Sequence, residues 1–218
     1  MSATLRLGTR GSKLALWQAN WAKARLGELR PDISVEIQVI RTMGDQVQDR
    51  PLVELNIEGA FTKELDRALL TNDIDFAVHS LKDVPTMFPE GITLAAVPER
   101  EDPRDAFVSN NFKSLEELPQ GARLGTSSLR RQSQIAALRP DLKIIDLRGN
   151  VNTRLKKLDD GEYDAIILAA AGLKRLEFED RITQYIATAK LRLATESHQD
   201  NSFYANHTKP ESSQFQEL

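Results

Sequence analysis

The stretch GTSSLRRQ, at positions 125–132, combines hydroxyl and basic residues at a spacing suited to binding an anion. A strand-like run precedes it and the helix-like run LRRQSQIAAL follows, so one of its hydroxyls is expected to cap a helix start. Arg130 and Arg131 then lie in the first helical turn, which favours acidic over basic side chains by about 0.3–1 kcal/mol per charge. A bound anion would explain the two arginines. Two solvated surface arginines are the alternative.

Further cations and hydroxyls follow other expected strands. Because the net charge of the chain is -3, cations gathered at strand ends indicate a focused positive region. Guanidinium groups bind carboxylates and phosphates bidentately, so a small polyanion is the expected ligand. The residues concerned are Arg10 and Ser12, Lys82, Arg148 with Arg154 one helical turn later, and Lys174 and Arg175.

Asp83, in the run HSLKDVP, is the carboxylate among these cations. Such a group can stabilise a developing positive charge and transfer a proton, which predicts a ligand that also carries a cation. A helix cap or an ion pair with Lys82 is the alternative role. His79 ends the apolar run before this motif, and we expect it to be structural.

Strand and helix patterns alternate along the chain, which predicts an α/β fold with largely parallel strands. RLGTRGSKLALWQA near the start resembles RLGTSSLRRQSQIAA in the middle, and each leads to a helix ending in LRPD and a further strand. This repeat predicts two similar lobes around a cleft, since ligands of such sheets bind beyond the carboxyl ends of the strands. Chance similarity of short βα units is the alternative.

Composition excludes several classes of protein. The 218 residues contain no cysteine, which removes disulfide scaffolds and thiolate chemistry. A pI near 5.7 and 6% aromatic residues argue against nucleic-acid binding. No signal peptide, membrane span or metal-ligand spacing is recognisable, so we expect a cytoplasmic protein without a metal. Residues 187–218 lose the apolar periodicity, and we expect a disordered polar tail without strand or helix.

Six motifs, in order from Leu5 to Ile186, together resemble the porphobilinogen deaminase (hydroxymethylbilane synthase) family: LGTRGSKLALWQA, HSLKDVP, EREDPRDAFVS, GTSSLRRQ, LRGNVNTRL and YDAIILAAAGLKRL. The resemblance implies two lobes of the periplasmic-binding-protein type and a third, smaller domain that is missing here. The expected divisions are lobe 1 at 1–98 with substrate and catalytic residues, lobe 2 at 99–186 with carboxylate-binding arginines, and the aberrant tail at 187–218.

The resemblance also implies a reaction of tetrapyrrole (haem) biosynthesis. Four porphobilinogen units, each carrying acetate and propionate groups, are joined head to tail into hydroxymethylbilane with release of ammonia, on a dipyrromethane cofactor. Asp83 would be catalytic, acting on pyrrole nitrogens and the cationic intermediate. The resemblance assigns substrate binding to Arg10, Ser12, Arg148, Arg154 and Arg175, and cofactor binding to Lys82, Thr126, Ser128, Arg130 and Arg131.

Two departures from the family pattern affect these expectations. Glu58 stands in LNIEGAFTKE where a lysine is common, which puts one anion contact of the lid loop in question. The family attaches its cofactor through a cysteine of the third domain, and this chain has none, so we expect a truncated or frameshifted member. A catalytically disabled fragment, or a binding module for polycarboxylate pyrroles, is the alternative function. The expected partner is porphobilinogen, with no nucleic acid or membrane, and the expected state is a monomer.

Overall fold

The computed structural model describes residues 3–46, 59–186 and 201–206. Contacts divide the chain into two compact units, with the boundary between Arg100 and Glu101. The strand at 201–206 belongs to unit 1 with the residues up to 100, and unit 2 begins at 101. The predicted boundary at 98 lies two residues before this division.

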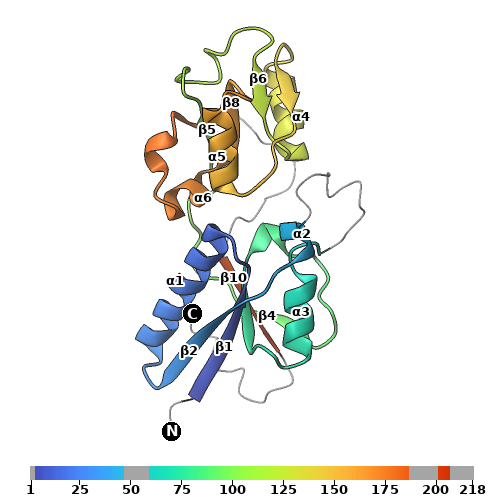
Figure 1. Ribbon diagram of the computed structural model, residues 1–218, viewed down its shortest axis with the longest axis vertical. Helices are drawn as coiled ribbons and strands as arrows, with labels where there is room; N and C mark the ends of the chain where they lie inside the picture. The colour runs from blue at the N-terminus through green and yellow to red at the C-terminus, as the bar shows by residue number, and fades with distance from the viewer. Residues whose placement is uncertain (1–2, 47–58, 187–200, 207–218) are drawn as a thin grey trace. The chain divides into compact units, whose positions relative to one another are not determined.

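Unit 1 is a five-stranded sheet with order β2-β1-β3-β10-β4, covered by helices (Figure 1). Alternate residues of a strand face opposite sides, so Leu7, Phe76 and Val78 pack with α1 while Ala77 packs with α3. Each face therefore has its own core. The elements are β1 (Ala3–Thr9), α1 (Lys13–Leu29), β2 (Ile33–Val39), α2 (Met43–Gln46), α3 (Lys63–Leu70), β3 (Phe76–Ser80), the 3-10 turn η1 (Leu81–Asp83), β4 (Ile92–Ala96) and β10 (Asn201–Asn206).

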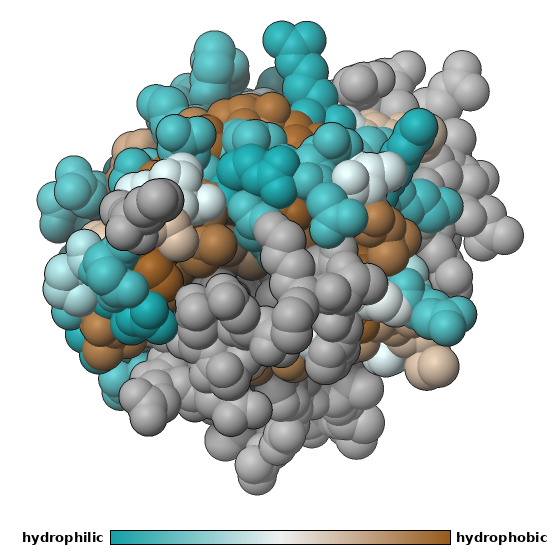
Figure 2. Space-filling model, turned by 90° about the horizontal axis from the view of Figure 1, so that it is seen from below, coloured by the Kyte–Doolittle hydropathy of each residue, from teal (hydrophilic) through white to brown (hydrophobic). Residues whose placement is uncertain are grey.

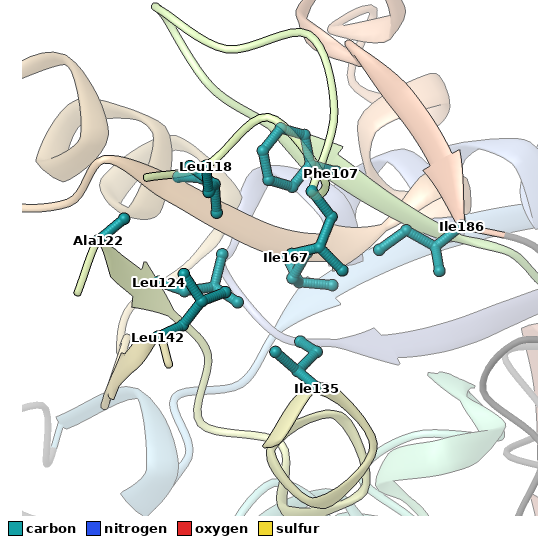
Figure 3. Close-up of a cluster of buried hydrophobic side chains, with 10 residues drawn as sticks. Phe107, Leu118, Ala122, Leu124, Ile135, Leu142, Ile167 and Ile186 are labelled. Carbon is teal, nitrogen blue, oxygen red and sulfur yellow. The ribbon is translucent and has the colours of Figure 1, made fainter. Parts of the chain in front are cut away.

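Unit 2 has a second five-stranded sheet, with order β7-β6-β8-β5-β9. Phe107, Leu124 and Ile167 pack on one face against Ile135 of the helix α4, in the cluster drawn in Figure 3. The opposite face packs against α5 and α6. The elements are β5 (Asp105–Val108), β6 (Arg123–Gly125), α4 (Leu129–Leu138), β7 (Lys143–Ile145), α5 (Val151–Asp159), β8 (Ala165–Ala169), α6 (Ala170–Arg175), the 3-10 turn η2 (Glu179–Arg181) and β9 (Gln184–Ile186).

The internal repeat predicted from sequence is present in three dimensions. Both sheets have the same order of strands, with β1 and β6 at matching places. In the first RLGT motif, Arg6 donates through Nε to Asp75 Oδ2 at 3.1 Å, and in the second, Arg123 donates to Asp164 Oδ2 at 3.2 Å. The glycine of each motif allows close packing, because a Cβ there would collide with Ile74 in unit 1 or Tyr163 in unit 2. The similarity is therefore structural and not accidental.

The strands are largely parallel, as expected, but this expectation is wrong for the fourth strand of each sheet. β5 runs antiparallel to β8 and β9, and β10 runs antiparallel to β3 and β4. In both sheets this strand comes from the part of the chain that has just left the other unit. A crossover that arrives from outside a βαβ unit is not constrained to the parallel direction.

The expectation that residues 187–218 contain no strand is also wrong. β10 lies between β3 and β4, with Asn201 opposite Ser80 and Ala205 opposite Phe76. The Ser- and Asn-rich composition gave no sign of this strand in the sequence. The strand forms nevertheless, because backbone groups of β3 and β4 supply its hydrogen bonds whatever its side chains are. The expected disorder of residues 187–200 and 207–218 lies outside the described residues.

On the coloured part of the face in Figure 2, apolar residues lie between hydrophilic ones, as is usual for a folded domain.

Among the helices of residues 3–46 and 59–186, none is long and apolar enough to cross a membrane.

Candidate functional site

A small pocket in unit 1 gathers the residues of the first RLGTRGS motif and of HSLKDVP. It forms where β1 and β3 end beside the start of α1, at the carboxyl edge of parallel strands. Its polar lining combines a guanidinium group, a carboxylate, an imidazole and hydroxyls. The lining residues are Arg10, Ser12, Leu14, Ala15, Gln18, Val78, His79, Ser80 and Asp83.

Two of the predicted substrate-binding residues have partners within unit 1. Arg10 donates through Nε to Asp45 Oδ2 at 3.2 Å, and its guanidinium carbon lies 4.0 Å from the ring centre of Phe61. Burial raises the pKa of Asp45, but the hydrogen bonds and positive charge of Arg10, together with hydrogen bonds from Thr42, outweigh it and hold that pKa below its usual value. The hydroxyl of Ser12 caps α1 by accepting from the amide of Ala15 at 3.2 Å. A ligand carboxylate at Arg10 would therefore compete with Asp45.

Asp83, at the end of η1, lies half-buried in this pocket. Within residues 3–46, 59–186 and 201–206, no hydrogen bond or ion pair occupies its carboxylate, so neither the capping role nor the pairing with Lys82 is present. Ser80, just before η1, accepts a hydrogen bond from Nε2 of the buried Gln18 at 2.9 Å. This contact ties the turn that carries Asp83 to α1. Lys82 is exposed.

His79 lines this pocket and is buried, at 5% relative exposure. Burial, with a smaller contribution from the positive charge of Arg10, lowers the pKa of His79 to about 4. The imidazole is therefore neutral at physiological pH. The pocket gains no positive charge from it, which agrees with the structural role expected from sequence.

His79 should make unit 1 less stable as the pH falls from 6.5 to 4. In that window the unfolded chain binds a proton that the folded chain does not, so stability decreases by up to about 1.4 kcal/mol per pH unit. His79→Gln should flatten this dependence. Urea denaturation at several pH values can follow it by tryptophan fluorescence, because both tryptophans, Trp17 and Trp21, lie in α1. If the free energy of unfolding changed equally with pH in the wild-type chain and in His79→Gln, the role assigned to His79 would be contradicted.

In unit 2, GTSSLRRQ forms the predicted strand-to-helix turn. Ser128 is the N-cap of α4, and its hydroxyl accepts from the amide of Arg131 at 3.4 Å. Thr126 is fully buried, and its hydroxyl accepts from the amide of Ser128 at 3.3 Å. The hydroxyl of Ser127 donates to the carbonyl of Leu147 at 2.6 Å, which joins the turn to the segment after β7. These hydroxyls hold the turn in shape.

Arg130 and Arg131 share an internal anion, the carboxylate of Asp105 at the start of β5. Arg131 donates through Nε and Nη2 to Oδ1 at 3.0 and 2.6 Å, and Arg130 donates through Nη2 to Oδ2 at 2.8 Å. Asp105 is 2% exposed; burial raises its pKa, but the two arginines outweigh this and keep the pKa below its usual value. Solvated surface arginines are thus the wrong interpretation for Arg131, which is buried.

The remaining predicted cations of unit 2 lie at the same carboxyl edge of its sheet. Arg148 is half-buried, and no described residue accepts a hydrogen bond from it or pairs with it. Arg154 donates through Nε to the carbonyl of Gly149 at 2.7 Å, and Arg175 is buried at the end of α6. Lys174 pairs with Asp102 at 2.9 Å. Arg148 is thus the cation of this group best placed to accept an external anion.

Internal carboxylates therefore neutralise part of the positive region that the sequence predicts. Sequence reasoning missed Asp45, Asp102 and Asp105, which pair with predicted cations, and Phe61, which stacks on Arg10. Only the acidic run EREDPRD carried a signal, since its charges immediately precede a strand. In the parts that the structure describes, no group of three or more acidic or histidine side chains could hold a metal ion.

Residues 5–198 match the family model described as porphobilinogen deaminase, dipyromethane cofactor binding domain. This chain belongs to the porphobilinogen deaminase family. It is 55% identical over 182 residues to a porphobilinogen deaminase of Geobacter sulfurreducens. The match covers 84% of this chain and 57% of that relative, so the chain spans little more than half of the length of the relative.

Solved structures support the fold expected for the family. The methionine-binding protein MetQ is similar with a TM-score of 0.58 and 14% identity, over 98% of this chain and 89% of that one. A periplasmic substrate-binding protein of an ABC transporter from Coxiella burnetii has a TM-score of 0.59 and 13% identity, over 98% and 90% of the chains. The α/β fold with two units of the periplasmic-binding-protein type is thus confirmed, while identities this low carry no information on ligand.

Proposed function

We propose that this chain provides the substrate- and cofactor-binding part of a hydroxymethylbilane synthase, which condenses four porphobilinogen molecules head to tail and releases ammonia. The observation that carries the proposal is the carboxylate of Asp83, which has no partner among the described residues and shares a pocket with Arg10 and Ser12. The substrate class agrees with this lining, because porphobilinogen carries carboxylates and develops positive charge when its amino group leaves.

The residues of each unit have distinct roles in this proposal. In unit 1, Arg10 and Ser12 bind substrate carboxylates, Lys82 binds those of the cofactor, and Asp83 stabilises the cationic carbon left by ammonia and accepts a pyrrole proton. In unit 2, Arg148, Arg154 and Arg175 bind substrate carboxylates. Thr126 and Ser128 shape the turn that presents Arg130 and Arg131 to the cofactor.

The donor set fits the carboxylates of a dipyrromethane group but not its covalent attachment. Arg130 uses two N–H donors in hydrogen bonds, and a guanidinium group has five. Arg148 adds a cation with no described counter-charge. When bound, the cofactor supplies the pyrrole carbon to which substrate is added. The chain contains no cysteine, so its own residues form no thioether with that group.

Incubation of the purified chain with porphobilinogen tests the function directly. Ammonia release together with a linear tetrapyrrole product is the expected result, and calorimetry should show porphobilinogen binding. A folded chain that does not bind porphobilinogen would contradict the proposal. We also propose a monomer located in the cytoplasm, which size-exclusion chromatography and cell fractionation would check.

Binding without turnover is the second candidate function, and the missing cysteine favours it. A covalent tether raises the effective concentration of a cofactor, and these 218 residues contain no cysteine to form one. Calorimetric binding of porphobilinogen without ammonia release would identify a binding module for polycarboxylate pyrroles. Ammonia release would exclude it.

A further inference from the structure

The cluster of Asp105, Arg130 and Arg131 has an unequal geometry. The side chain of Arg131 is 8% exposed, and Arg131 also donates a hydrogen bond through Nη1 to the carbonyl of Ile167 at 3.4 Å. The side chain of Arg130 is 23% exposed, and its other bond donates through Nη1 to Oε1 of Gln134 at 3.4 Å. Arg131 is therefore fixed inside unit 2, whereas Arg130 keeps three donors and part of its surface for a ligand.

The internal repeat indicates that the fold itself does not need this cluster. Both α1 and α4 begin one residue after a serine N-cap, so Arg130 and Arg131 correspond in position to Leu14 and Ala15 of unit 1.

The antiparallel strands β5 and β10 correspond in the same way. Asp105 lies opposite Ala169, and Asn201 lies opposite Ser80. Since β3 and β8 match residue by residue in their pairing to β1 and β6, the place of Asp105 is taken by Asn201 in unit 1. Unit 1 thus forms the same sheet and helix start without an acidic residue or arginines at these places.

Burial of the charges of Asp105 and Arg131 is a poor way to gain stability. Desolvation of ionic groups often cancels their attraction, and apolar residues of similar volume are commonly as stable or more stable. The cluster has a formal charge of +1, because one carboxylate faces two guanidinium groups. The cluster is thus a positively charged group in which Arg131 is fixed and Arg130 is accessible.

We propose that Asp105 is a positioning residue that fixes Arg130, through the shared carboxylate and the buried Arg131, in place to bind one ligand carboxylate. This rests on the proposed function for the ligand, a pyrrole carboxylate. Asp105 does not touch the ligand. Its removal frees both arginines to move, and a misplaced guanidinium group loses the strong, geometry-dependent hydrogen bonds that it forms with a carboxylate.

Asp105→Ala tests the proposal with two readouts. The variant should bind porphobilinogen at least about tenfold more weakly in calorimetry, the effect of losing one hydrogen bond between charged groups. It should also melt at lower temperature, and sodium formate should restore more of that loss than sodium chloride of equal ionic strength. Formate can replace the missing carboxylate between the arginines, and an anion that binds only the folded chain raises its stability.

Asp164→Ala is the matched control. Asp164 pairs with Arg123 at 3.0 Å in the same unit, but it precedes β8 and so lies at the opposite edge of the sheet. This variant should lose stability without a specific effect of formate and without a change in porphobilinogen affinity. If Asp105→Ala does not fold, Asp105→Asn keeps the volume, and its affinity is compared with that of Asp164→Asn.

The outcomes separate the possible roles of Asp105. If an Asp105 variant is less stable but binds porphobilinogen with unchanged affinity, Asp105 has only a structural role. If the variant binds porphobilinogen more tightly, Asp105 competes with the ligand for the arginines. Either result overturns the proposal. A wild-type chain that does not bind porphobilinogen contradicts the proposed function instead. In that case the melting temperature of Asp105→Ala in formate is the remaining test of the positioning role, because the effect of formate needs no pyrrole. Equal effects of formate and chloride on that melting temperature would overturn the positioning role.

Discussion

Asp83→Ala is expected to lower ammonia release from porphobilinogen by about 10²- to 10⁴-fold, the usual contribution of a positioned acid or base. The carboxylate lies in the pocket of unit 1, and no described residue neutralises it. It is therefore free to stabilise the positive charge that develops as the amino group leaves. Porphobilinogen affinity should change little, because the arginines proposed to bind its carboxylates remain. The measurement compares initial rates of ammonia release at saturating porphobilinogen with calorimetric affinities.

Asp73→Ala is the control for this prediction. Asp73 is an exposed aspartate of the same unit, and its carboxylate accepts a hydrogen bond from Thr71 at 2.6 Å. Its loss should leave both rate and affinity unchanged. Full turnover in Asp83→Ala would show that the assigned role is wrong, and a large loss of affinity would move Asp83 from catalysis to substrate binding.

Arg131→Met should lower the free energy of unfolding of unit 2 by about 3–5 kcal/mol, the range found when one partner of a buried ion pair is removed. Arg131 and Asp105 are 6% and 2% exposed, so the carboxylate loses two of its three hydrogen bonds where water cannot replace them. Burial would then raise the pKa of Asp105 toward protonation.

Arg130→Met is the informative comparison. Arg130 is more exposed and gives Asp105 one hydrogen bond, so its loss should cost within about 1 kcal/mol of stability. It should nevertheless weaken porphobilinogen binding, because the accessible guanidinium group is gone. Hydrogen exchange of peptides from residues 101–186 is the suitable measurement, since both tryptophans report on unit 1. Equal losses of stability in the two variants would contradict the division between a buried and an accessible arginine.

Much of the fold was predictable because local patterns determine it. The repeated RLGT and LRPD motifs predicted two similar units, and the structure has two sheets of the same strand order. The cap at the start of α4 was predictable from its hydroxyls, and Ser128 occupies it. The strand β10 was not predictable, because its pairing partners, β3 and β4, are more than a hundred residues away.

The candidate site was predictable in its residue types but not in its charge balance. Arg10, Asp83, Arg130 and Arg148 were named from their places at strand ends, and the structure places each at a carboxyl edge of its own sheet. Their assigned roles in binding and catalysis stay predictions. The sequence did not indicate that Asp45 pairs with Arg10 or that Asp105 pairs with both arginines, since these partners are 35 and 25 or 26 residues apart.

The sequence by itself determined the family, the α/β fold and the repeat, because these depend on residue types and on spacing along the chain. The polyanionic character of the ligand stays a prediction. Only the tertiary structure decided the direction of β5 and β10 and which cations remain available to a ligand. The direction depends on where each crossover enters a sheet. The availability depends on which distant carboxylate folding brings within hydrogen-bonding distance of each arginine, and Asp105 takes that place for Arg131 while Arg148 has no such partner among the described residues.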